Sequence, residues 1–509
     1  MSELRKSYDV IIIGAGVGGG AMANMLAKAG AKVLLIERGK RLPREADNWS
    51  VKAVFHDRKY ATNETWRDRN GTEFNPSTYY YVGGNSKFFG TATLRFRAED
   101  FADLQHEAGV APAWPISYAE LAPYYDEAER LLGTHGTAGL DPCEPPRSGP
   151  MPYAAIGHEP EIAAIDKRLR ERGLKPFPLP VAIDLHPGGK CVRCATCDGF
   201  ACMLGAKNDA EVRLVDPAIA TGNVDLIIET LVHRLVTDVS GQKVIGVEVE
   251  EGGQKKTISG KLFISSAGAI NSAVLLLRSA SDKHPRGLGN NSSDQLGRNY
   301  MAHNNTAMMA VNPLKKNNVV FQKSLCINDY YLANTVKPYP LGNVQGLGKL
   351  QGGMLTANMK AIPEWLMSWF ATRSVDWWIM SEDLPDPNNR VSVDSDGKIK
   401  LSYTPNNLKS HRELVRHWTK LMRALGYPII ITQKMDIKVA MHQCGTARFG
   451  NDPKTSVLDP FCKVWDLDNL YVVDASFLPS STAVNPSLTI VAQAVRVAEH
   501  LINEVLKIR

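Results

Sequence analysis

YDVIIIGAGVGG, at residues 8–19, joins an apolar run to a glycine-rich turn. Val10 to Ile13 is typical of a fully buried parallel strand, and Gly14, Gly16 and Gly19 have the G-x-G-x-x-G spacing. Glycines in this pattern allow a tight turn, close approach of the backbone to a pyrophosphate, and close packing of helix on strand. Residues 21–29, rich in Ala and Met, are predicted to form a helix whose N-terminus faces the pyrophosphate.

A second apolar run strengthens this interpretation. Residues 32–36 predict a strand, and Glu37 follows it directly. A carboxylate at this position binds ribose hydroxyls, which favours NAD or FAD over NADP. The glycine pattern alone is a weak signal, but between a strand and a helix, with an acid after the next strand, it predicts a Rossmann-like domain.

The composition is that of an ordinary globular protein. The 509 residues allow two or more domains, and 44% of them are hydrophobic. The net charge of +6 is too dilute to indicate binding to nucleic acid. No apolar run reaches the roughly 18 residues of a membrane helix, and the glycine turn interrupts any N-terminal signal peptide, so we expect a cytoplasmic protein without a membrane span.

The order of predicted elements gives an α/β (α+β) fold with two domains. Residues 1–300 are assigned to the Rossmann-like domain, with a cysteine-rich loop at 188–207 and a β-meander at about 224–260. Residues 301–434 predict a second, mainly antiparallel-sheet domain that binds substrate, and residues 435–509 return to the first domain.

Periodicity predicts several individual elements. Helices are expected over 98–134, 159–173, 411–426 and 488–507, and strands of the second domain include 318–325 and 349–355. The second domain contains four tryptophans that could stack on a sugar or aglycone, seal a lid or subunit contact, or pack in the core. They are Trp365, Trp369, Trp377 and Trp378.

Other residues are candidates for cofactor contact. The stretch YYYVGGNSKFFGTATLRF, at 79–96, suits a wall against a flat ring system, because its glycine pair permits close approach and its small polar residues can donate hydrogen bonds. Gly268 lies in a glycine turn after a buried strand, where it can back the cofactor. Asp474 follows an apolar strand, where a carboxylate can bind a ribityl or phosphate group. The candidates are Gly83, Gly84, Asn85, Ser86, Val232, Gly268 and Asp474.

Over essentially its full length the chain resembles the glucose–methanol–choline (GMC) family of FAD-dependent oxidoreductases. The motifs that carry the resemblance are GAGVGG with Glu37, VGGNS at 82–86, GAINSAVLLL at 268–277, GRNYMAH at 297–303, and the C-terminal pair HQCGT and NPSLT. The resemblance implies that the Rossmann-like domain binds FAD. Within the family, residues 82–96 are most similar to the flavin-contacting stretch of the pyranose-oxidase branch. A histidine there carries a covalent flavin bond, and Phe88 occupies the matching position, so we predict non-covalent FAD.

The resemblance also implies the catalytic residues. His442 matches the family's base near the flavin, and its partner, a histidine or an asparagine in the family, is Asn485. An imidazole with a pKa near ~6.5 can take a hydroxyl proton at neutral pH. The amide of Asn485 can hold the same hydroxyl, and His303 and Asn304 are secondary candidates.

Four of the eight cysteines, Cys191, Cys194, Cys197 and Cys202, lie within twelve residues. Such clustering indicates a ligand set or a redox loop, and sulfur ligands suit an iron–sulfur cluster or zinc. The spacing departs from the ferredoxin run, because the last gap is four residues and Met203 follows. Similarity to the loop of GMC sugar dehydrogenases implies an iron–sulfur cluster. Structural zinc, one or two disulfides, and free thiols remain alternatives.

The sequence and the resemblance together predict oxidation of a secondary ring hydroxyl of a sugar or glycoside, at C3 or C2, to a ketone. The electron acceptor is expected to be a partner protein, a quinone or dye, or O₂, and a small subunit or a homo-oligomer fits the resemblance. Periplasmic localisation is expected only if the chain is exported with a partner subunit. The alternatives are an O₂-using pyranose or alcohol oxidase, a GMC enzyme acting on a non-sugar alcohol, and a non-redox flavoprotein lyase.

Overall fold

A five-stranded parallel sheet forms the centre of the nucleotide-binding part of the fold. The computed structural model describes residues 5, 7–251, 254–334, 337–358, 361–439 and 442–508. The sheet has the order β11-β2-β1-β15-β23, and every neighbouring pair is parallel. Its strands are β1 (Val10–Ile13), β2 (Val33–Ile36), β11 (Val224–Ile227), β15 (Leu262–Ser265) and β23 (Leu470–Val472). The predicted Rossmann-like domain is therefore confirmed.

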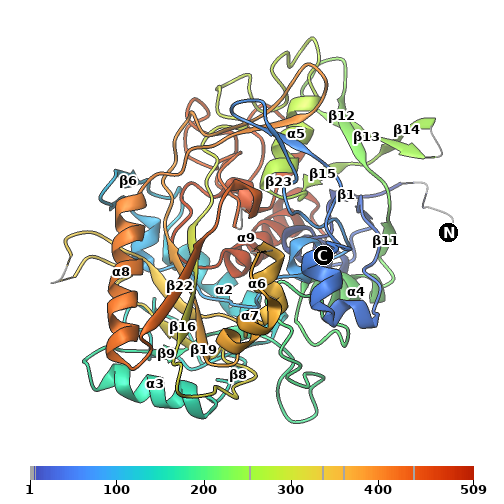
Figure 1. Cartoon of the computed structure of the whole chain (residues 1–509). Coiled ribbons are helices and arrows are strands. Elements are labelled where there is room, and N and C mark those ends of the chain that lie inside the picture. The colour runs from blue at the N-terminus through green and yellow to red at the C-terminus, as the bar shows by residue number, and fades with distance from the viewer. Residues whose placement is uncertain are drawn as a thin grey trace.

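The two ends of the chain meet on this sheet. Helix α1 (Val17–Lys28) packs against α9 (Ser487–His500), and α9 also packs against α2 (Tyr118–Leu132). Figure 1 shows the blue N-terminal and red C-terminal elements side by side around the sheet. The predicted last helix ends as α9 at His500, and a π-helical turn continues over Leu501–Val505.

The predicted meander is shorter than expected. Strands β12 (Val232–Thr237), β13 (Val244–Glu251) and β14 (Gln254–Ser259) form a three-stranded antiparallel sheet. The segment from residue 224 was predicted to belong to it, which is wrong. It forms β11, which pairs in parallel with β2 and so completes one edge of the central sheet.

A six-stranded sheet with the order β22-β16-β19-β18-β17-β9 makes the second half of the molecule, and all its pairs are antiparallel. Helix α8 (Leu408–Ala424) and helix α3 (Pro160–Arg170) cover one face, where Trp377 meets Trp418 edge-to-face at 4.9 Å between ring centroids. The strands are β9 (Phe177–Pro178), β16 (Asn304–Val311), β17 (Leu325–Ile327), β18 (Asn343–Gly346), β19 (Ser374–Ser381) and β22 (Ile429–Lys434).

Two predicted strands of this sheet are wrong. Residues 349–355 enter α6 (Gly352–Asn358), which packs closely against α7 (Glu364–Ala371), since a Cβ on Gly352 would lie 2.1 Å from Ser368 Oγ. Most of 318–325 is irregular, because the carboxylate of Glu159 accepts the backbone N–H groups of Val320 and Phe321.

The predicted helix over 98–134 is correct only for α2. The segment before it holds a short 3₁₀ turn, Ala98–Phe101, and a two-stranded hairpin of β5 (Leu104–Gln105) and β6 (Val110–Ala111). Gly109, with φ of +154°, lies in the hairpin turn, and its backbone C=O accepts the N–H of His106.

The remaining elements connect these layers. Strands β20 (Arg390–Val393) and β21 (Ile399–Ser402) leave the second half and pair with β3 (Trp66–Asp68), which pairs with β4 (Glu73–Phe74). The domain boundaries therefore stay a prediction, because the sheets mix segments from either side of residue 301. The other elements are β7 (Thr134–Gly136), β8 (Tyr153–Ala154), β10 (Val181–Ala182), α4 (Asp216–Ala220) and α5 (Ala269–Arg278).

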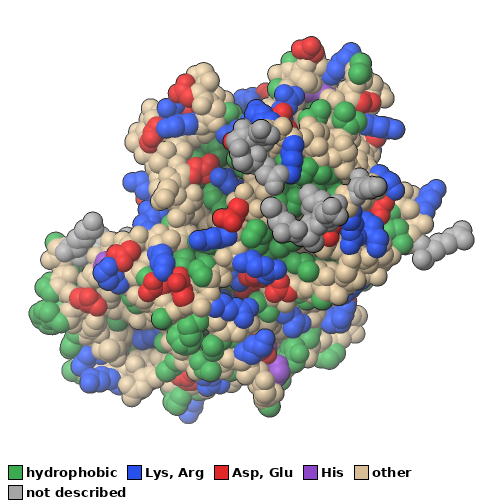
Figure 2. Space-filling view, turned by 90° about the vertical axis from the view of Figure 1, so that its right-hand side faces the viewer, with side chains coloured by type: hydrophobic (Ala, Val, Ile, Leu, Met, Phe, Trp, Pro, Cys, Tyr) green, Lys and Arg blue, Asp and Glu red, His purple; other side chains and the backbone are tan. Residues whose placement is uncertain are grey.

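The surface has a mixed charge pattern. Figure 2 shows basic and acidic side chains interspersed across the visible face, as the small net charge of +6 leads one to expect. Within the described ranges, none of the helices is both long and apolar enough to cross a bilayer.

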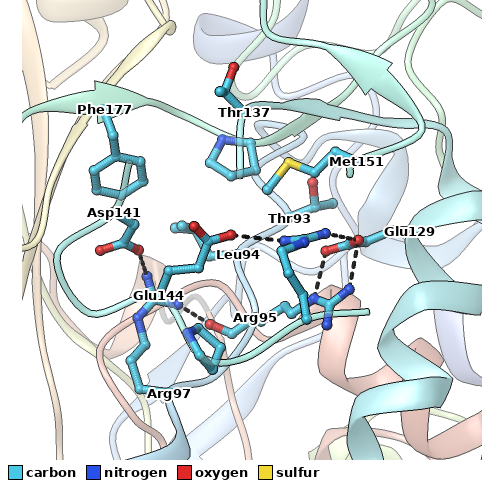
Figure 3. A pocket seen from close by; sticks show the side chains of 13 residues that line it. Thr93, Leu94, Arg95, Arg97, Glu129, Thr137, Asp141, Glu144, Met151 and Phe177 are labelled. Atoms are coloured by element: carbon cyan, nitrogen blue, oxygen red, sulfur yellow. Dashed lines mark hydrogen bonds and ion pairs between the residues drawn. The ribbon is translucent and has the colours of Figure 1, made fainter. Parts of the chain in front are cut away.

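A buried group of ion pairs lies where α2 meets the segment after it (Figure 3). The guanidinium of Arg95 donates from Nε and Nη2 to the two carboxylate oxygens of Glu129, each at 2.8 Å, and Arg147 pairs with the same carboxylate. Arg97 pairs with Asp141 beside them. These charges line a small pocket but already neutralise one another, so we interpret the group as structural.

Replacing Arg95 should weaken the fold strongly. Arg95→Met removes one of the two cations that pair with the buried carboxylate of Glu129. It is expected to lower the free energy of unfolding by about 3–5 kcal/mol. The measurement is the midpoint of thermal denaturation of the holoenzyme, which should fall. Arg130, which is 64% exposed and pairs with Glu127 on the same helix, is the control. Arg130→Met should change stability by less than about 1 kcal/mol. Equal effects would contradict a structural role for the buried pair.

Candidate active site

The first glycine turn is built to leave one side open. A Cβ on Gly14, whose φ is +100°, would lie 2.4 Å from the Ser266 carbonyl oxygen, and a Cβ on Gly19 would lie 1.9 Å from the Gly14 oxygen. A Cβ on Gly16 would meet nothing within 4 Å. Two of the glycines therefore allow the chain to pack on itself, and the third borders free space at the start of α1, where a pyrophosphate would accept backbone N–H groups.

Glu37 lies beside this turn, at the end of β2. Its carboxylate is 5% exposed and accepts the backbone N–H groups of Ala15 and Gly39, each at 2.9 Å. Burial raises the pKa of Glu37, and these two hydrogen bonds oppose the shift. The segment that leads to Val232 passes the same place, because the N–H of Thr230 donates to the Glu37 carbonyl at 3.1 Å.

The second glycine pair contacts the first turn directly. The N–H of Gly83 donates to the Ala15 carbonyl at 2.9 Å, and a Cβ on Gly84 would lie 3.2 Å from Gly16 Cα. Ser86 is buried and accepts the N–H of Ala210, whereas Asn85 is exposed. Gly83 and Gly84 thus pack directly on the first glycine turn, and the role of residues 83–86 as a wall of the cofactor site stays a prediction.

Gly268 and Asp474 follow β15 and β23, the two strands at the edge of the central sheet opposite β11. Gly268 has φ of +89°, and a Cβ there would meet nothing within 4 Å. The buried carboxylate of Asp474 accepts hydrogen bonds from Gly268 N at 3.0 Å, from the hydroxyl of Ser272, and from the N–H and hydroxyl of Ser476. The side chain of Asp474 therefore orients the backbone next to the open turn at Gly268.

A short backbone pairing brings the two histidines together. Met301 and Cys444 form an isolated antiparallel bridge, with N–H···O distances of 3.0 and 2.9 Å. In this register the residues two positions further along, His303 and His442, lie opposite each other. Their Nδ1 atoms are 2.9 Å apart.

His442 contacts the second predicted catalytic residue on its other side. Its Nε2 lies 3.4 Å from Nδ2 of Asn485, which lies immediately before Pro486 and α9. The backbone of His442 has φ of +61°, a left-handed conformation that is uncommon outside glycine and recurs at functional sites. The structure thus brings together His442 and Asn485, which are 43 residues apart.

A residue that the sequence did not single out, Gln345, completes this row. It lies on β18 and donates from Nε2 to Oδ1 of Asn485 at 3.2 Å. Its cross-strand neighbour is Trp378, so both side chains lie on the face of the six-stranded sheet opposite α8. β18 reads NVQG, and neither of its two amides gives a sequence signal of its own, so only the fold reveals this contact.

The site holds its histidines in the neutral form. Burial lowers the pKa of His442 well below the ordinary value of 6.5, and the nearby His303 and Lys323 lower it further. Burial also lowers the pKa of His303. A neutral His442 is able to accept a proton from a hydroxyl group, while Asn485 offers a hydrogen-bond donor next to it.

The four clustered cysteines line a common cavity with Trp49, Ile183 and Lys207. Burial raises the pKa of Cys197 to about 12 and raises that of Cys191. Among the residues that the structure describes, no group of three or more His, Cys, Asp or Glu side chains is arranged to hold a metal ion. The cysteines are neighbours, but their present geometry does not fit a metal site.

The cysteine loop is anchored to both walls of the active site. Lys207 Nζ donates to the carbonyls of Phe89 and Phe200. Asp198 accepts from Lys323 Nζ at 2.6 Å and from the N–H of Gly348, three residues after Gln345. The loop therefore touches the segment next to the glycine pair and the end of β18.

Comparison with known proteins matches two family models, both described as GMC oxidoreductase, to residues 8–304 and 385–494. The chain belongs to the GMC oxidoreductase family. It is accordingly an FAD-dependent oxidoreductase that acts on CH–OH groups, and the open backbone at Gly16 and Gly268 is compatible with the cofactor.

Individual relatives align over nearly the whole chain. The chain is 31% identical to 6'''-hydroxyparomomycin C oxidase of Streptomyces lividus, over 97% of this chain and 92% of the relative. It is 30% identical to paromamine 6'-oxidase of Streptomyces fradiae (97% and 91%) and 27% identical to the fructose dehydrogenase large subunit of Gluconobacter japonicus (99% and 99%). Pyridoxine 4-oxidase from Mesorbium loti shares the fold, with a TM-score of 0.68, 19% identity, and coverage of 98% and 100%.

The lowered pKa of His442, the predicted base, determines the expected pH profile of the enzyme. A base acts in its unprotonated form, and a lowered pKa keeps that form populated until the pH falls through the lowered value. The kcat/KM for flavin reduction should therefore stay constant from neutral pH down to 6.5 and decline only at lower pH. Stopped-flow measurements, with flavin absorbance as a check on cofactor retention, test this. An acid limb centred at or above pH 6.5 would contradict it.

Proposed function

We propose that this enzyme oxidises a hydroxyl group of a sugar or glycoside, with a secondary ring hydroxyl at C3 or C2 as the leading candidate. The observation that carries the chemistry is the pairing of His442 Nε2 with Asn485 Nδ2, 3.4 Å apart. An alcohol hydroxyl needs one group to accept its proton and another to donate to its oxygen, and these two atoms supply both.

His442 is the proposed base, and Asn485 the group that orients the substrate. Nε2 takes the hydroxyl proton, while the amide N–H holds the oxygen and so directs the reacting C–H. FAD, when bound, supplies the hydride acceptor. The six-stranded sheet forms the floor beneath the pair, through Gln345 and, beside it, Trp378.

The relatives support a sugar substrate. Two have names that refer to paromomycin or paromamine compounds and one is a fructose dehydrogenase subunit. The name paromamine 6'-oxidase gives a specific reason for a second candidate, oxidation at a position outside the ring carbons C2 and C3. A sugar without its 6-hydroxyl separates the two, because it remains a substrate only if a ring hydroxyl reacts.

Anaerobic flavin reduction tests this function. Oxidised holoenzyme mixed with monosaccharides, glycosides, their 6-deoxy forms, choline and simple alcohols should lose its flavin absorbance with sugars, including 6-deoxy sugars. His442→Gln should bind FAD but be reduced about 10²- to 10⁴-fold more slowly. Bleaching by non-sugar alcohols alone would overturn the substrate class. Bleaching by no alcohol would favour the lyase alternative.

The electron acceptor is a separate part of the proposal. We favour a dehydrogenase that passes electrons to a partner protein or a quinone, since one relative is named as the large subunit of a dehydrogenase. An O₂-using oxidase is the alternative, in line with the two relatives named as oxidases. Hydrogen peroxide formation, compared with dye reduction on the same sugar, decides between them.

Localisation also stays a prediction. We propose that the protein is cytoplasmic and is exported only alongside a partner subunit, which cell fractionation tests.

We propose that FAD is bound without a covalent link. Phe88 is buried and stacks on Tyr79 at 3.9 Å between ring centroids, within an apolar cluster. A phenyl ring offers no nucleophile for attachment.

An iron–sulfur cluster in the cysteine loop is a further proposal, supported by the shared cavity and the loop's contacts with both walls of the site. The loop would have to rearrange to bring its thiolates onto a metal, as the geometry described above requires. Zinc, disulfides and free thiols are the alternatives.

One sample tests both cofactor proposals. Acid precipitation of the purified enzyme should release all of its FAD into the supernatant, and analysis of the native protein should find iron and acid-labile sulfide. Yellow colour retained in the pellet would contradict non-covalent binding. A protein without iron would contradict the cluster, and zinc analysis and thiol titration would then separate the alternatives. Replacing the four loop cysteines by Ser should remove the iron, whereas Cys326→Ser, outside the loop, is the control and should keep it.

A further inference from the structure

We infer that His303 and Gln345 are positioning residues at the two ends of a one-directional hydrogen-bond chain, Gln345 to Asn485 to His442 to His303 to the Ser481 carbonyl, which places the reactive lone pair on Nε2 of His442. The inference rests on the proposed role of His442 as the base, but not on which alcohol is the substrate.

The hydrogen-bond chain ends at an atom that can only accept. His303 Nε2 lies 2.8 Å from the backbone oxygen of Ser481, and a carbonyl oxygen has no proton to give. His303 Nε2 therefore carries hydrogen. The Ser481 carbonyl is itself fixed, because the Ser481 hydroxyl donates to the Asp383 carbonyl and accepts the Asp383 N–H, and the N–H of Thr482 donates to Glu382.

The tautomer of His303 determines the tautomer of His442. His303 is 6% exposed and neutral, since burial lowers its pKa, so its single ring proton is on Nε2 and its Nδ1 is an acceptor. The two Nδ1 atoms are 2.9 Å apart, which requires one of them to donate. The donor is His442 Nδ1–H. A neutral His442 then has its lone pair on Nε2, the atom that faces Asn485.

The other end of the chain fixes the amide of Asn485. Nε2 of Gln345 donates to Asn485 Oδ1 at 3.2 Å, which turns Nδ2 toward His442. If both amides were reversed, Asn485 Oδ1 would face the Nε2 lone pair and the two acceptors would repel. The Ser481 carbonyl, three contacts along the chain from Asn485, thus excludes the reversed arrangement.

The direction of the chain suits a hydroxyl substrate. The contact between Asn485 Nδ2 and His442 Nε2, at 3.4 Å, is the longest of the chain. A hydroxyl that replaces it accepts from Nδ2 and donates to Nε2 without any change elsewhere in the chain. When Nε2 takes the hydroxyl proton, the charge on the His442 ring is shared with the Nδ1 lone pair of His303 across the short contact.

Nitrogen NMR of ¹⁵N-histidine-labelled, oxidised holoenzyme tests the tautomer without any substrate. His442 is identified by the signal lost in His442→Gln. We expect a protonated Nδ1 and an unprotonated Nε2, and a protonated Nε2 in the wild-type enzyme would overturn the inference. If the tautomer is as expected but no sugar bleaches the flavin, the proposed substrate fails and the inference stands.

Two substitutions of His303 separate positioning from packing. His303→Asn keeps an acceptor near the place of Nδ1, whereas His303→Gln keeps a group that reaches Ser481 but lacks that acceptor. With whichever alcohol reduces the flavin, His303→Gln should lower kcat about 10- to 100-fold with little change in KM, and should lose the single His442 tautomer. His303→Asn should restore much of both. Wild-type kcat in His303→Gln would overturn the role of His303.

Substitutions of Gln345 test the other end of the hydrogen-bond chain, and Asn343 on the same strand, β18, provides the control. Gln345→Glu places an acceptor against Asn485 Oδ1 and should lower kcat about 10-fold or more, while Gln345→Met removes the donor and should have a smaller effect. Asn343, also on β18, donates a hydrogen bond to Asn328 and does not take part in the hydrogen-bond chain of the active site. Asn343→Leu should lower thermal stability but keep kcat. An unchanged kcat in Gln345→Glu, or equal kcat losses in Gln345→Glu and Asn343→Leu, would overturn the role of Gln345.

Discussion

The pairing of Met301 with Cys444 is the contact on which the active site depends. Two backbone hydrogen bonds set an antiparallel register between segments 143 residues apart, and that register places His303 opposite His442. A shift of one residue in this pairing would place a different residue opposite His303. The neighbouring backbone carries the same segment onward, because the N–H of Gly445 donates to the Ala475 carbonyl and that of Ala447 to the Ser476 carbonyl. His442, the proposed base, is thus fixed to the segment that follows β23 of the nucleotide-binding sheet.

The molecule therefore joins two sheets with different tasks. The parallel sheet carries the glycine turns, which leave open backbone surfaces at the ends of its strands, where ligands of such sheets bind. The antiparallel sheet presents one apolar face to α8 and the opposite face, with Gln345, to the proposed catalytic pair, His442 and Asn485. Asn485 lies just before α9, the helix that packs on α1. A substrate hydroxyl held by this pair is consequently positioned by both halves of the fold.

The parts of this arrangement that are local in sequence could be predicted, and the parts that depend on distant contacts could not. The turn at Gly14 to Gly19 combines strand, glycines and helix within one stretch, so its structure and its role follow from pattern alone. Segment 349–355 shows the opposite case. It alternates like a strand, but its glycines let it pack as a helix on α7. In the site, His442 and Asn485 could be predicted because they lie in motifs that resemble a known family. Gln345 lies in no motif, and the contact of His303 with His442 follows only from the pairing of Met301 with Cys444.

Burial of the base creates a conflict that the surrounding chain has to resolve. Desolvation keeps His442 neutral and able to accept a proton, but it also disfavours the charged ring that forms once the proton has arrived. The described contacts of the ring nitrogens are to His303 and Asn485, so the charge has to be stabilised by dipoles and lone pairs rather than by a direct carboxylate contact. Such groups stabilise charge well only when they are already oriented, because reorientation during the reaction would cost the energy that they supply. A chain of hydrogen bonds that is held at one end by a fixed backbone carbonyl meets this requirement for the proposed base, His442.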